Sequence, residues 1–137
     1  MQLNDPELVR RQYASEAGLK MRRESQRRFR TGPDAFDVAF DVISKLKPRR
    51  VLEVGCGMGN FAERVARETR AEVIATDLSP RMVELAHERG LDARVADVES
   101  LPFADGEFDC AVANAMLYHV ENLDRALSEL ARVLEPK

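Results

Sequence analysis

Three glycines at alternate positions end the apolar run in the stretch VLEVGCGMGN. Gly55, Gly57 and Gly59 have no Cβ atom, so the backbone there can take positive φ and let a ligand approach closely. A helix after such a loop directs free N–H groups and partial positive charge toward a carboxylate or a phosphate. The GK[ST] ending of a nucleotide P-loop is missing, and Asn60 stands where the dinucleotide fingerprint wants a third glycine. The stretch therefore predicts an anion-accepting turn and argues against a triphosphate site.

Two acidic residues follow at later strand ends. Asp77 lies 22 residues after Gly55, where a carboxylate can accept hydrogen bonds from both hydroxyls of a ribose. Asp97 is followed by Val98, and a carboxylate beside a free backbone N–H matches the amino group and ring nitrogen of adenine. The simpler alternatives are that Asp77 only helps to start a helix at Ser79 and that Asp97 is a turn residue. Spacing and residue type favour ribose recognition by Asp77.

A parallel sheet would bring these residues together. Short β-rich runs predict four strands, at residues 51–54, 71–76, 91–96 and 108–113. Helical spacing and capping residues predict helices from Asp34 to before Pro48, over 61–70, from Ser79 to Gly90, and after Asn122. This alternation predicts the α/β class, with a Rossmann-like, doubly wound parallel sheet of strand order 3-2-1-4. Ligands bind such sheets beyond the carboxyl end of the first strand, which is where the glycines lie.

The composition is that of one soluble globular domain. The 137 residues are 45% hydrophobic and 33% charged. No apolar run approaches the roughly 20 residues of a membrane helix, and the N-terminus lacks an apolar signal core. We therefore expect a cytoplasmic protein without a membrane partner. Cys56 and Cys110 have neither CxxC spacing nor the density of a disulfide scaffold, so both are expected to be reduced.

The N-terminal segment is basic. Residues 1–30 carry eight Lys and Arg against four Asp and Glu, a net charge of +4. Loosely helical apolar spacing over residues 5–30 predicts one or two helices that pack on the main body. Because only Tyr13 and Phe29 are aromatic among these residues, the pattern favours a solvated helix face over a nucleic-acid surface.

Four motifs in this order resemble the class I S-adenosylmethionine-dependent methyltransferases, in the branch of small-molecule enzymes similar to those of ubiquinone and menaquinone biosynthesis. They are LEVGCGMG, ATDLSPRMVELA, ADVESLPFADGEFDCAVA, and NAMLYHV followed by ALSELARVLEP. The resemblance runs from about Pro48 to Lys137. It implies transfer of a methyl group from S-adenosyl-L-methionine to a small-molecule acceptor, with S-adenosyl-L-homocysteine as the product.

The resemblance also implies roles for individual residues. Those implied for the cofactor's methionine end are Gly55, Cys56 and Gly57 beneath it, Glu53 at its amino group and Asn114 beside its sulfonium. Those implied for its nucleoside are Asp77 at the ribose, Leu78 and Met82 flanking the adenine, and Asp97 with the Val98 backbone at the adenine edge. By analogy with relatives whose N-terminal helix closes the pocket, Tyr13 would cap it.

No catalytic residue is assigned by the sequence. Because the cofactor carries an activated group, a protein contributes mainly alignment and desolvation, and a general base is optional. Tyr118 and His119 lie where an acceptor would approach, and His119 could accept a proton near neutral pH. Packing and hydrogen bonding at a loop turn are an equal alternative for both. His87 and His119 stand in separate segments without a ligand cluster, so no metal is expected.

The chain ends RVLEPK where relatives continue with a Gly-Gly turn and three more strands. We therefore expect a helical segment at 1–47 and a C-terminally incomplete, truncated methyltransferase core at 48–137. A bare fourth strand would recruit a partner unless it is covered, so a homodimer through this edge or the N-terminal helices is one expectation. The alternatives to a methyltransferase are a non-catalytic cofactor-binding or dimerisation module and a nicotinamide-dependent Rossmann protein. Asn60 and the Asp97-Val98 pair argue against the last.

Overall fold

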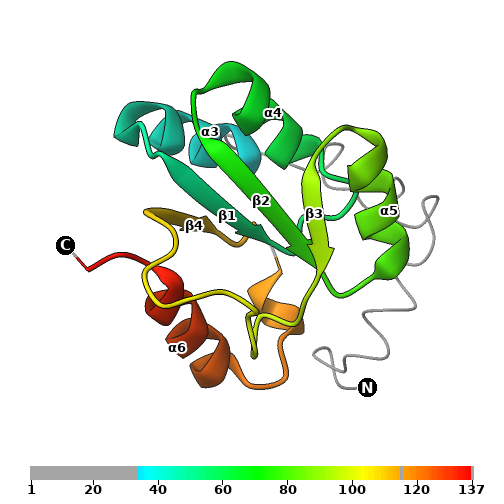
Figure 1. Ribbon diagram of the computed structural model, residues 1–137, viewed down its shortest axis with the longest axis vertical. Coiled ribbons are helices and arrows are strands. Elements are labelled where there is room, and N and C mark those ends of the chain that lie inside the picture. The colour runs from blue at the N-terminus through cyan, green and yellow to red at the C-terminus, as the bar shows by residue number, and fades with distance from the viewer. Residues whose placement is uncertain (1–33, 115, 137) are drawn as a thin grey trace.

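The computed structural model describes residues 34–114 and 116–136 of the chain. Within these residues four parallel strands form one sheet in the order β3-β2-β1-β4. Leu52 in the central strand pairs with Ile74 on one side and with Ala111 on the other. The predicted α/β class and strand order are confirmed (Figure 1). The strands are β1 Arg50–Val54, β2 Glu72–Asp77, β3 Asp92–Val95 and β4 Cys110–Val112.

Side-chain caps begin three of the helices. The Asp34 carboxylate accepts a hydrogen bond from the backbone N–H of Phe36 at 2.8 Å, and the Ser79 hydroxyl accepts one from Met82 at 3.2 Å. Asn122 caps the last helix in the same way. These bonds satisfy N–H groups that have no partner within the helix, and this is why polar residues at these positions predicted helix starts. The helices are α3 Ala35–Leu46, α4 Asn60–Glu68, α5 Pro80–Glu88 and α6 Leu123–Val133, with a one-turn 3-10 helix η1 at Leu117–His119.

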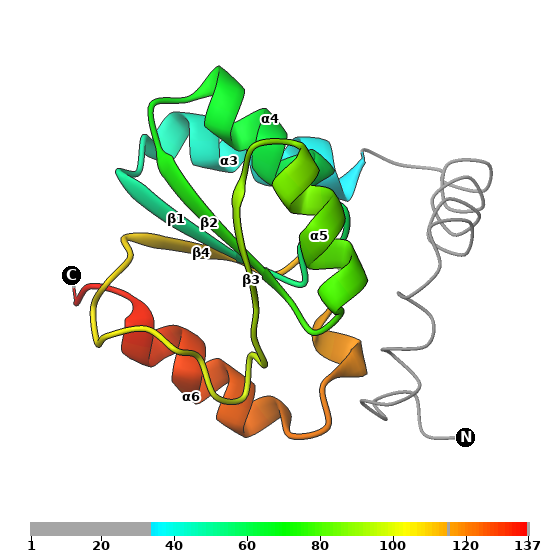
Figure 2. The same ribbon diagram turned by 45° about the vertical axis from the view of Figure 1, so that its right-hand side comes forward.

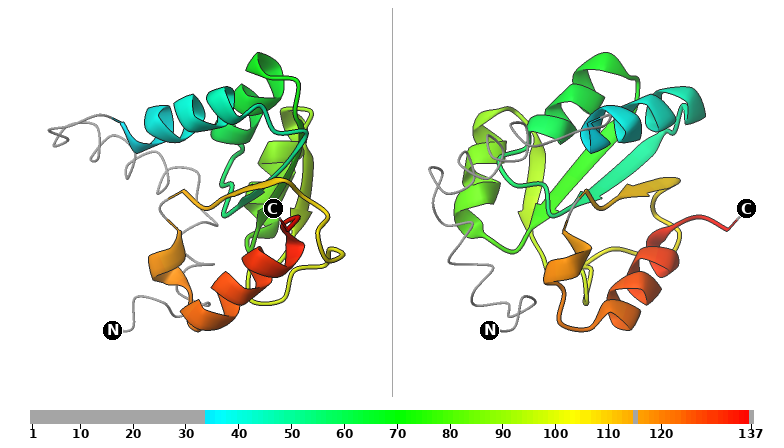
Figure 3. Two further views of the ribbon diagram at one scale, coloured as in Figure 1. Left: turned by 90° about the vertical axis from the view of Figure 1, so that its left-hand side faces the viewer. Right: turned by 180° about the vertical axis from the view of Figure 1, so that it is seen from behind.

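The helices cover both faces of the sheet. Figures 2 and 3 show α3 and α4 on one face and α6 on the opposite face. On the first face Ile43 of α3, Phe61 of α4 and Val83 of α5 pack in one buried cluster with inward-facing strand residues. On the second face Ala126 and Val133 of α6 pack against Leu52, Val54 and Phe108. Burial on both faces explains why the strands read as short continuous apolar runs.

The fourth strand is shorter than predicted. The sequence predicts a strand over 108–113, whereas β4 spans Cys110–Val112. Phe108 leaves the β1 register and bonds to the chain after α6, donating its N–H to the Val133 carbonyl at 2.9 Å and accepting from the Glu135 N–H at 2.8 Å. Its partner in this parallel bridge is Leu134. Phe108, the first residue of the predicted edge strand, is therefore already paired within the chain.

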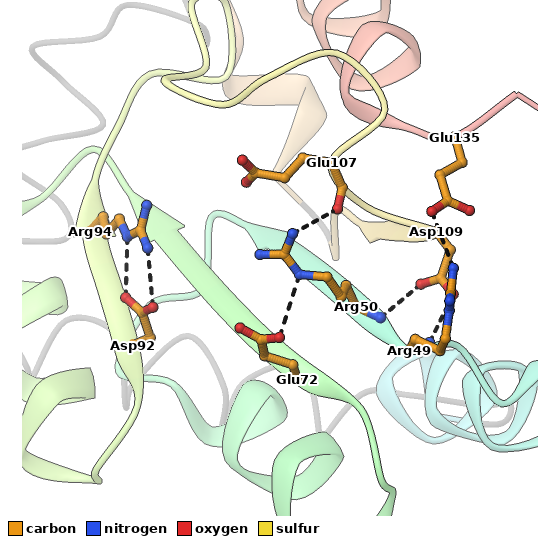
Figure 4. Close-up of polar contacts among 8 residues, drawn as sticks. All are labelled: Arg49, Arg50, Glu72, Asp92, Arg94, Glu107, Asp109 and Glu135. Carbon is orange, nitrogen blue, oxygen red and sulfur yellow. Dashed lines mark hydrogen bonds and ion pairs between the residues drawn. The ribbon is translucent and has the colours of Figure 1, made fainter.

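Charged residues stand at the first positions of the strands (Figure 4). The Asp109 carboxylate accepts hydrogen bonds from the backbone N–H groups of Arg49 and Arg50, both at 2.8 Å. The Arg50 side chain reaches Glu72 at the start of β2, at 3.5 Å. Partial burial alone would raise the pKa of Asp109, but the donated N–H groups and the Arg49 charge outweigh it and hold that pKa below its usual value. Asp109 therefore joins the starts of β1 and β4 as a carboxylate.

Replacement of Asp109 by alanine is expected to lower the free energy of unfolding by about 2 kcal/mol at neutral pH, because two N–H groups lose a charged acceptor. Since the folded-state pKa is lowered, this contribution is full above the ordinary Asp pKa of about 3.9 and is lost as the pH falls through the folded value. Urea unfolding of both proteins between neutral and acid pH measures it. Glu135→Ala, which removes only an exposed partner of Arg49, should cost less than about 0.5 kcal/mol. Equal losses for the two variants would contradict the assignment.

The predicted helices over 5–30 and the Tyr13 cap lie outside the described residues. No helix within residues 34–114 and 116–136 is long and apolar enough to cross a membrane. The division of the chain at residues 47 and 48 stays a prediction, although Ile43 of α3 shares a core with the sheet.

Candidate functional site

One carboxylate organises the carboxyl ends of β1 and β2. Asp77, the last residue of β2, accepts a hydrogen bond from the Gly57 N–H at 2.8 Å and another from the Ser79 N–H at 2.9 Å. The Cys56 N–H donates to the Thr76 carbonyl at 2.9 Å. The glycine loop after β1 is thus fastened to the end of β2 and to the start of α5. Its bond to the Ser79 N–H also places Asp77 at the start of this helix, as the simpler alternative has it.

Asp77 is only 2% exposed. Burial raises the pKa of Asp77 above the ordinary Asp value, while the N–H groups of Ser79, Gly57 and Leu78 act in the opposite direction. Each carboxylate oxygen has two lone pairs. Both oxygens therefore have room for a further donor, so the fastening role and a ligand-binding role are compatible.

A cleft opens beside these strand ends. Its walls come from the ends of β1 and β2, the loop after β3, and the segment from Met116 to Glu121 that includes η1 (Figure 1). Most of the lining is apolar, with carboxylates at Asp77, Asp97, Glu99 and Glu121. The lining residues are Val54, Gly55, Thr76, Asp77, Leu78, Ala96, Asp97, Val98, Glu99, Met116, His119, Val120 and Glu121.

A second buried carboxylate lies in β1. Glu53 is 2% exposed, and its Oε2 accepts a hydrogen bond of 3.4 Å from the side-chain amide of Asn114. The parallel register places Glu53 opposite Val112, so Asn114 follows two residues later on the neighbouring strand end. The structure thus brings together two residues that were predicted separately. They do not line the cleft themselves.

Helix α6 holds the wall that carries Asp97. The Arg125 guanidinium donates to the Glu99 carbonyl at 2.7 Å. The Arg132 guanidinium donates to the carbonyls of Phe103 at 2.8 Å and Leu101 at 3.0 Å. These bonds satisfy carbonyls of a segment that has little regular structure. Helix α6, on the second face of the sheet, therefore positions one side of the cleft.

The Cys56 thiol is buried beneath the glycine loop and is 4% exposed. Burial raises its pKa strongly, and the nearby carboxylates of Asp77 and Glu53 raise it further. Because the thiolate is the nucleophile, we expect Cys56 to be unreactive in the folded protein.

Iodoacetamide at mildly alkaline pH should therefore modify Cys110 and leave Cys56 unmodified until the chain is unfolded in urea. Cys110 is half-buried, and its pKa is raised by burial and by Asp109, so its reaction is expected to be slow but measurable. Mass spectrometry of the peptides measures both thiols in one sample. Modification of Cys56 at the rate of Cys110 in the folded protein would contradict this.

Six of the predicted site residues line the cleft, namely Gly55, Asp77, Leu78, Asp97, Val98 and His119. Cys56 and Gly57 form the fastened loop next to it. Met82 is fully buried in α5 and does not line the cleft, so its contact with adenine stays a prediction. Tyr118 belongs to η1.

Sequence reasoning missed several lining residues, chiefly Met116, Glu99 and Glu121. Rules for strand ends identify polar residues directly after a strand, whereas these three lie in connecting segments whose path depends on tertiary packing. The available signals were the motif NAMLYHV, which contains Met116, and the motif that begins ADVES, which contains Glu99. Over residues 34–114 and 116–136, no group of three or more His, Cys, Asp or Glu residues could hold a metal ion.

Comparison with known proteins adds family information to this geometry. The family model described as "Methyltransferase domain" matches residues 52–137. Methyltransferase GfsG of Streptomyces halstedii is 40% identical over 95 residues, which cover 64% of this chain and 34% of that protein. The demethylmenaquinone methyltransferase of Thermus thermophilus is 35% identical over 105 residues, which cover 72% of this chain and 48% of that protein.

A solved structure is similar over the same part. An S-adenosylmethionine-dependent methyltransferase from Thermotoga maritima is 30% identical with a TM-score of 0.61, and the match covers 74% of this chain and 47% of the other. The chain thus spans less than half the length of each of these three relatives.

Proposed function

The chain belongs to the class I S-adenosylmethionine-dependent methyltransferase family, and on this premise we propose that it binds S-adenosylmethionine in the cleft and transfers the methyl group to a small-molecule acceptor. The observation that carries the proposal is the convergence of Gly55, Asp77, Asp97 and Val98 on one cleft at the carboxyl ends of the strands. This is the edge of a doubly wound sheet at which ligands bind.

The groups at this edge fit the cofactor chemically. Backbone N–H groups and the positive end of α4 suit a carboxylate, while the buried carboxylates Glu53 and Asp77 favour the cationic groups of an amino acid and a sulfonium. We assign Gly55, Cys56 and Gly57 to the methionine end, with Glu53 and Asn114 near its charged groups. A phosphate-binding function would not call for two buried carboxylates beside the loop.

The other wall suits a nucleoside. Asp77 has lone pairs available for two ribose hydroxyls in addition to its two N–H bonds. Leu78 and Val98 offer apolar surface to a planar base, and Asp97 offers an acceptor for the exocyclic amine. We retain Met82, with Leu78, as a residue that flanks the adenine.

When bound, S-adenosylmethionine supplies a methyl group activated on a sulfonium. The protein then has to exclude water, align the acceptor with the methyl group and, for an acidic nucleophile, take up a proton. His119 lines the cleft and is the described side chain we assign to proton uptake, and Tyr118 stays a second candidate from the same turn. A small-molecule acceptor, cytoplasmic residence and a homodimer are proposals that rest on the sequence.

Calorimetric titration of the folded chain with S-adenosylmethionine, S-adenosylhomocysteine and NAD tests the proposal. We expect micromolar binding of the two sulfur compounds and none of NAD. Absence of heat with both sulfur compounds would contradict the cofactor assignment, and comparable binding of NAD would favour the dinucleotide alternative. Methyl transfer is tested separately, with a labelled methyl group and a panel of small oxygen, nitrogen and carbon nucleophiles. Binding without transfer to any acceptor would favour the non-catalytic module.

A further inference from the structure

The Met116 side chain lies directly on Gly55. Gly55 has a φ of +68°, and a Cβ atom built on it would lie 2.7 Å from Met116 Cγ and 2.8 Å from Met116 Cβ. Distances this short mean that the side chain of Met116 occupies the space in which a side chain of residue 55 would lie. The face that Gly55 turns toward the cleft is therefore covered by another part of the same chain.

Met116 belongs both to the cleft and to the core beneath it. It lines the cleft beside Gly55, and it packs with the buried cluster that contains Leu52, Val54 and Val98. Methionine is unbranched and flexible, so it fills an irregular apolar space and also leaves it at low cost. This combination suits a side chain that holds a site closed to water without blocking it permanently.

We propose that Met116 is a displaceable plug, which fills the subsite above Gly55 when no cofactor is bound and leaves it when the methionine end of the cofactor enters. This inference rests on the proposed function, because it takes that subsite to be the one for the cofactor's methionine end. The plug keeps apolar strand residues covered in the free protein, and the cofactor replaces it as their cover.

The plug is connected to the acceptor side of the cleft. Met116 precedes η1, and its carbonyl accepts a hydrogen bond from the His119 N–H at 3.0 Å. His119 and Glu121 line the cleft beyond this turn. Rotation of the Met116 side chain out of the subsite would change the packing at the start of this turn, which faces the acceptor. Cofactor binding would arrange the acceptor wall, which predicts that the cofactor binds first and the acceptor second.

Removal of the plug should tighten cofactor binding. If the open form makes up roughly one chain in ten, truncation of the plug raises affinity up to about tenfold, because a ligand binds only the competent fraction. We therefore expect Met116→Ala to bind S-adenosylhomocysteine about tenfold more tightly than the wild type. Met116→Leu, which keeps most of the volume, should stay within about twofold. Val120→Ala removes apolar lining elsewhere in the cleft and should not tighten binding.

Methyl NMR observes the plug without any substitution. In protein labelled with ¹³C at the methionine methyl groups, titration with NAD, for which we expect no binding, serves as the reference. The Met116 resonance, assigned from its absence in Met116→Leu, should shift on saturation with S-adenosylhomocysteine and take the narrow form of a mobile side chain, and it should not shift with NAD.

The outcomes separate the two proposals. Wild-type binding with an unshifted Met116 resonance, or weaker binding by Met116→Ala, overturns the plug and leaves the cofactor site intact. Binding by Met116→Ala without binding by the wild type would support the plug most strongly. Absence of binding by both proteins, with both folded, overturns the cofactor site and the plug together.

Discussion

Substitution of Asp77 by alanine is expected to weaken the binding of S-adenosylhomocysteine at least tenfold. The variant loses the proposed acceptor of the ribose hydroxyls and also releases the Gly57 N–H, which Asp77 now binds at 2.8 Å. Charge-assisted hydrogen bonds in a buried site contribute about 1.5 to 3 kcal/mol each, and tenfold corresponds to about 1.4 kcal/mol. Calorimetry on both proteins measures the change. An affinity within twofold of the wild type would contradict the role of Asp77.

Two controls separate ligand contact from loop support. Asp92→Ala removes an equal charge from an exposed site at the start of β3 and should leave affinity within about twofold. Wild type should bind a cofactor analogue without the ribose 2′-hydroxyl more weakly than it binds the parent compound. Asp77→Ala should bind the analogue and the parent compound with equal affinity. Such non-additivity identifies a direct contact. If the losses of affinity from the substitution and from the analogue add, Asp77 only fastens the glycine loop.

Gly59→Ala is expected to lower the free energy of unfolding by about 3 kcal/mol. Gly59 precedes α4 with a φ of +89°, and a Cβ atom there would lie 2.6 Å from Leu91 Cδ1 and 3.1 Å from Ala86 Cβ. The left-handed conformation costs an L-residue about 1 to 2 kcal/mol, and overpacking adds about 1 to 3 kcal/mol. Urea unfolding followed by circular dichroism measures the loss.

Gly90→Ala isolates the conformational part of this cost. Gly90 has a similar φ of +83°, and no atom lies within 4 Å of the Cβ that would be added. Its substitution should therefore cost only about 1 kcal/mol. The difference between the two losses of unfolding free energy is the steric cost of the added methyl group where α4 meets α5. Equal losses would show that the contacts at Gly59 relax freely.

The sequence was sufficient where a site depends on local rules. Asp77 was predicted to be a site residue because a strand end, its residue type and its distance from the glycine loop agree. Each of these is a property of a short segment. The strand order followed from the alternation of elements. Asp97 and Val98 reached the cleft for the same reason, since both follow a strand that ends at the same edge.

The sequence was insufficient where the hydrogen-bonding or packing partners of a residue lie far away in the chain. Phe108 looks like the first residue of a strand, but its backbone bonds lie with Val133 and Glu135 rather than with β1. Asp109 was predicted as part of the fourth strand, and its two N–H partners lie about 60 positions away. The contact of Met116 with Gly55 depends on the path of a loop that no periodicity specifies. In each case the missing information is a long-range backbone path.

The ion pairs of Figure 4 and the cleft occupy opposite ends of the same strands. The five residues of β1 separate Arg50 from the glycine loop by roughly 17 Å at about 3.3 Å per residue, a distance beyond which substitutions usually act independently. Heat tolerance and ligand choice can therefore evolve on separate sets of positions. A library directed at Arg49, Glu72, Asp92 and Asp109 could be selected for thermal resistance without altering the cleft.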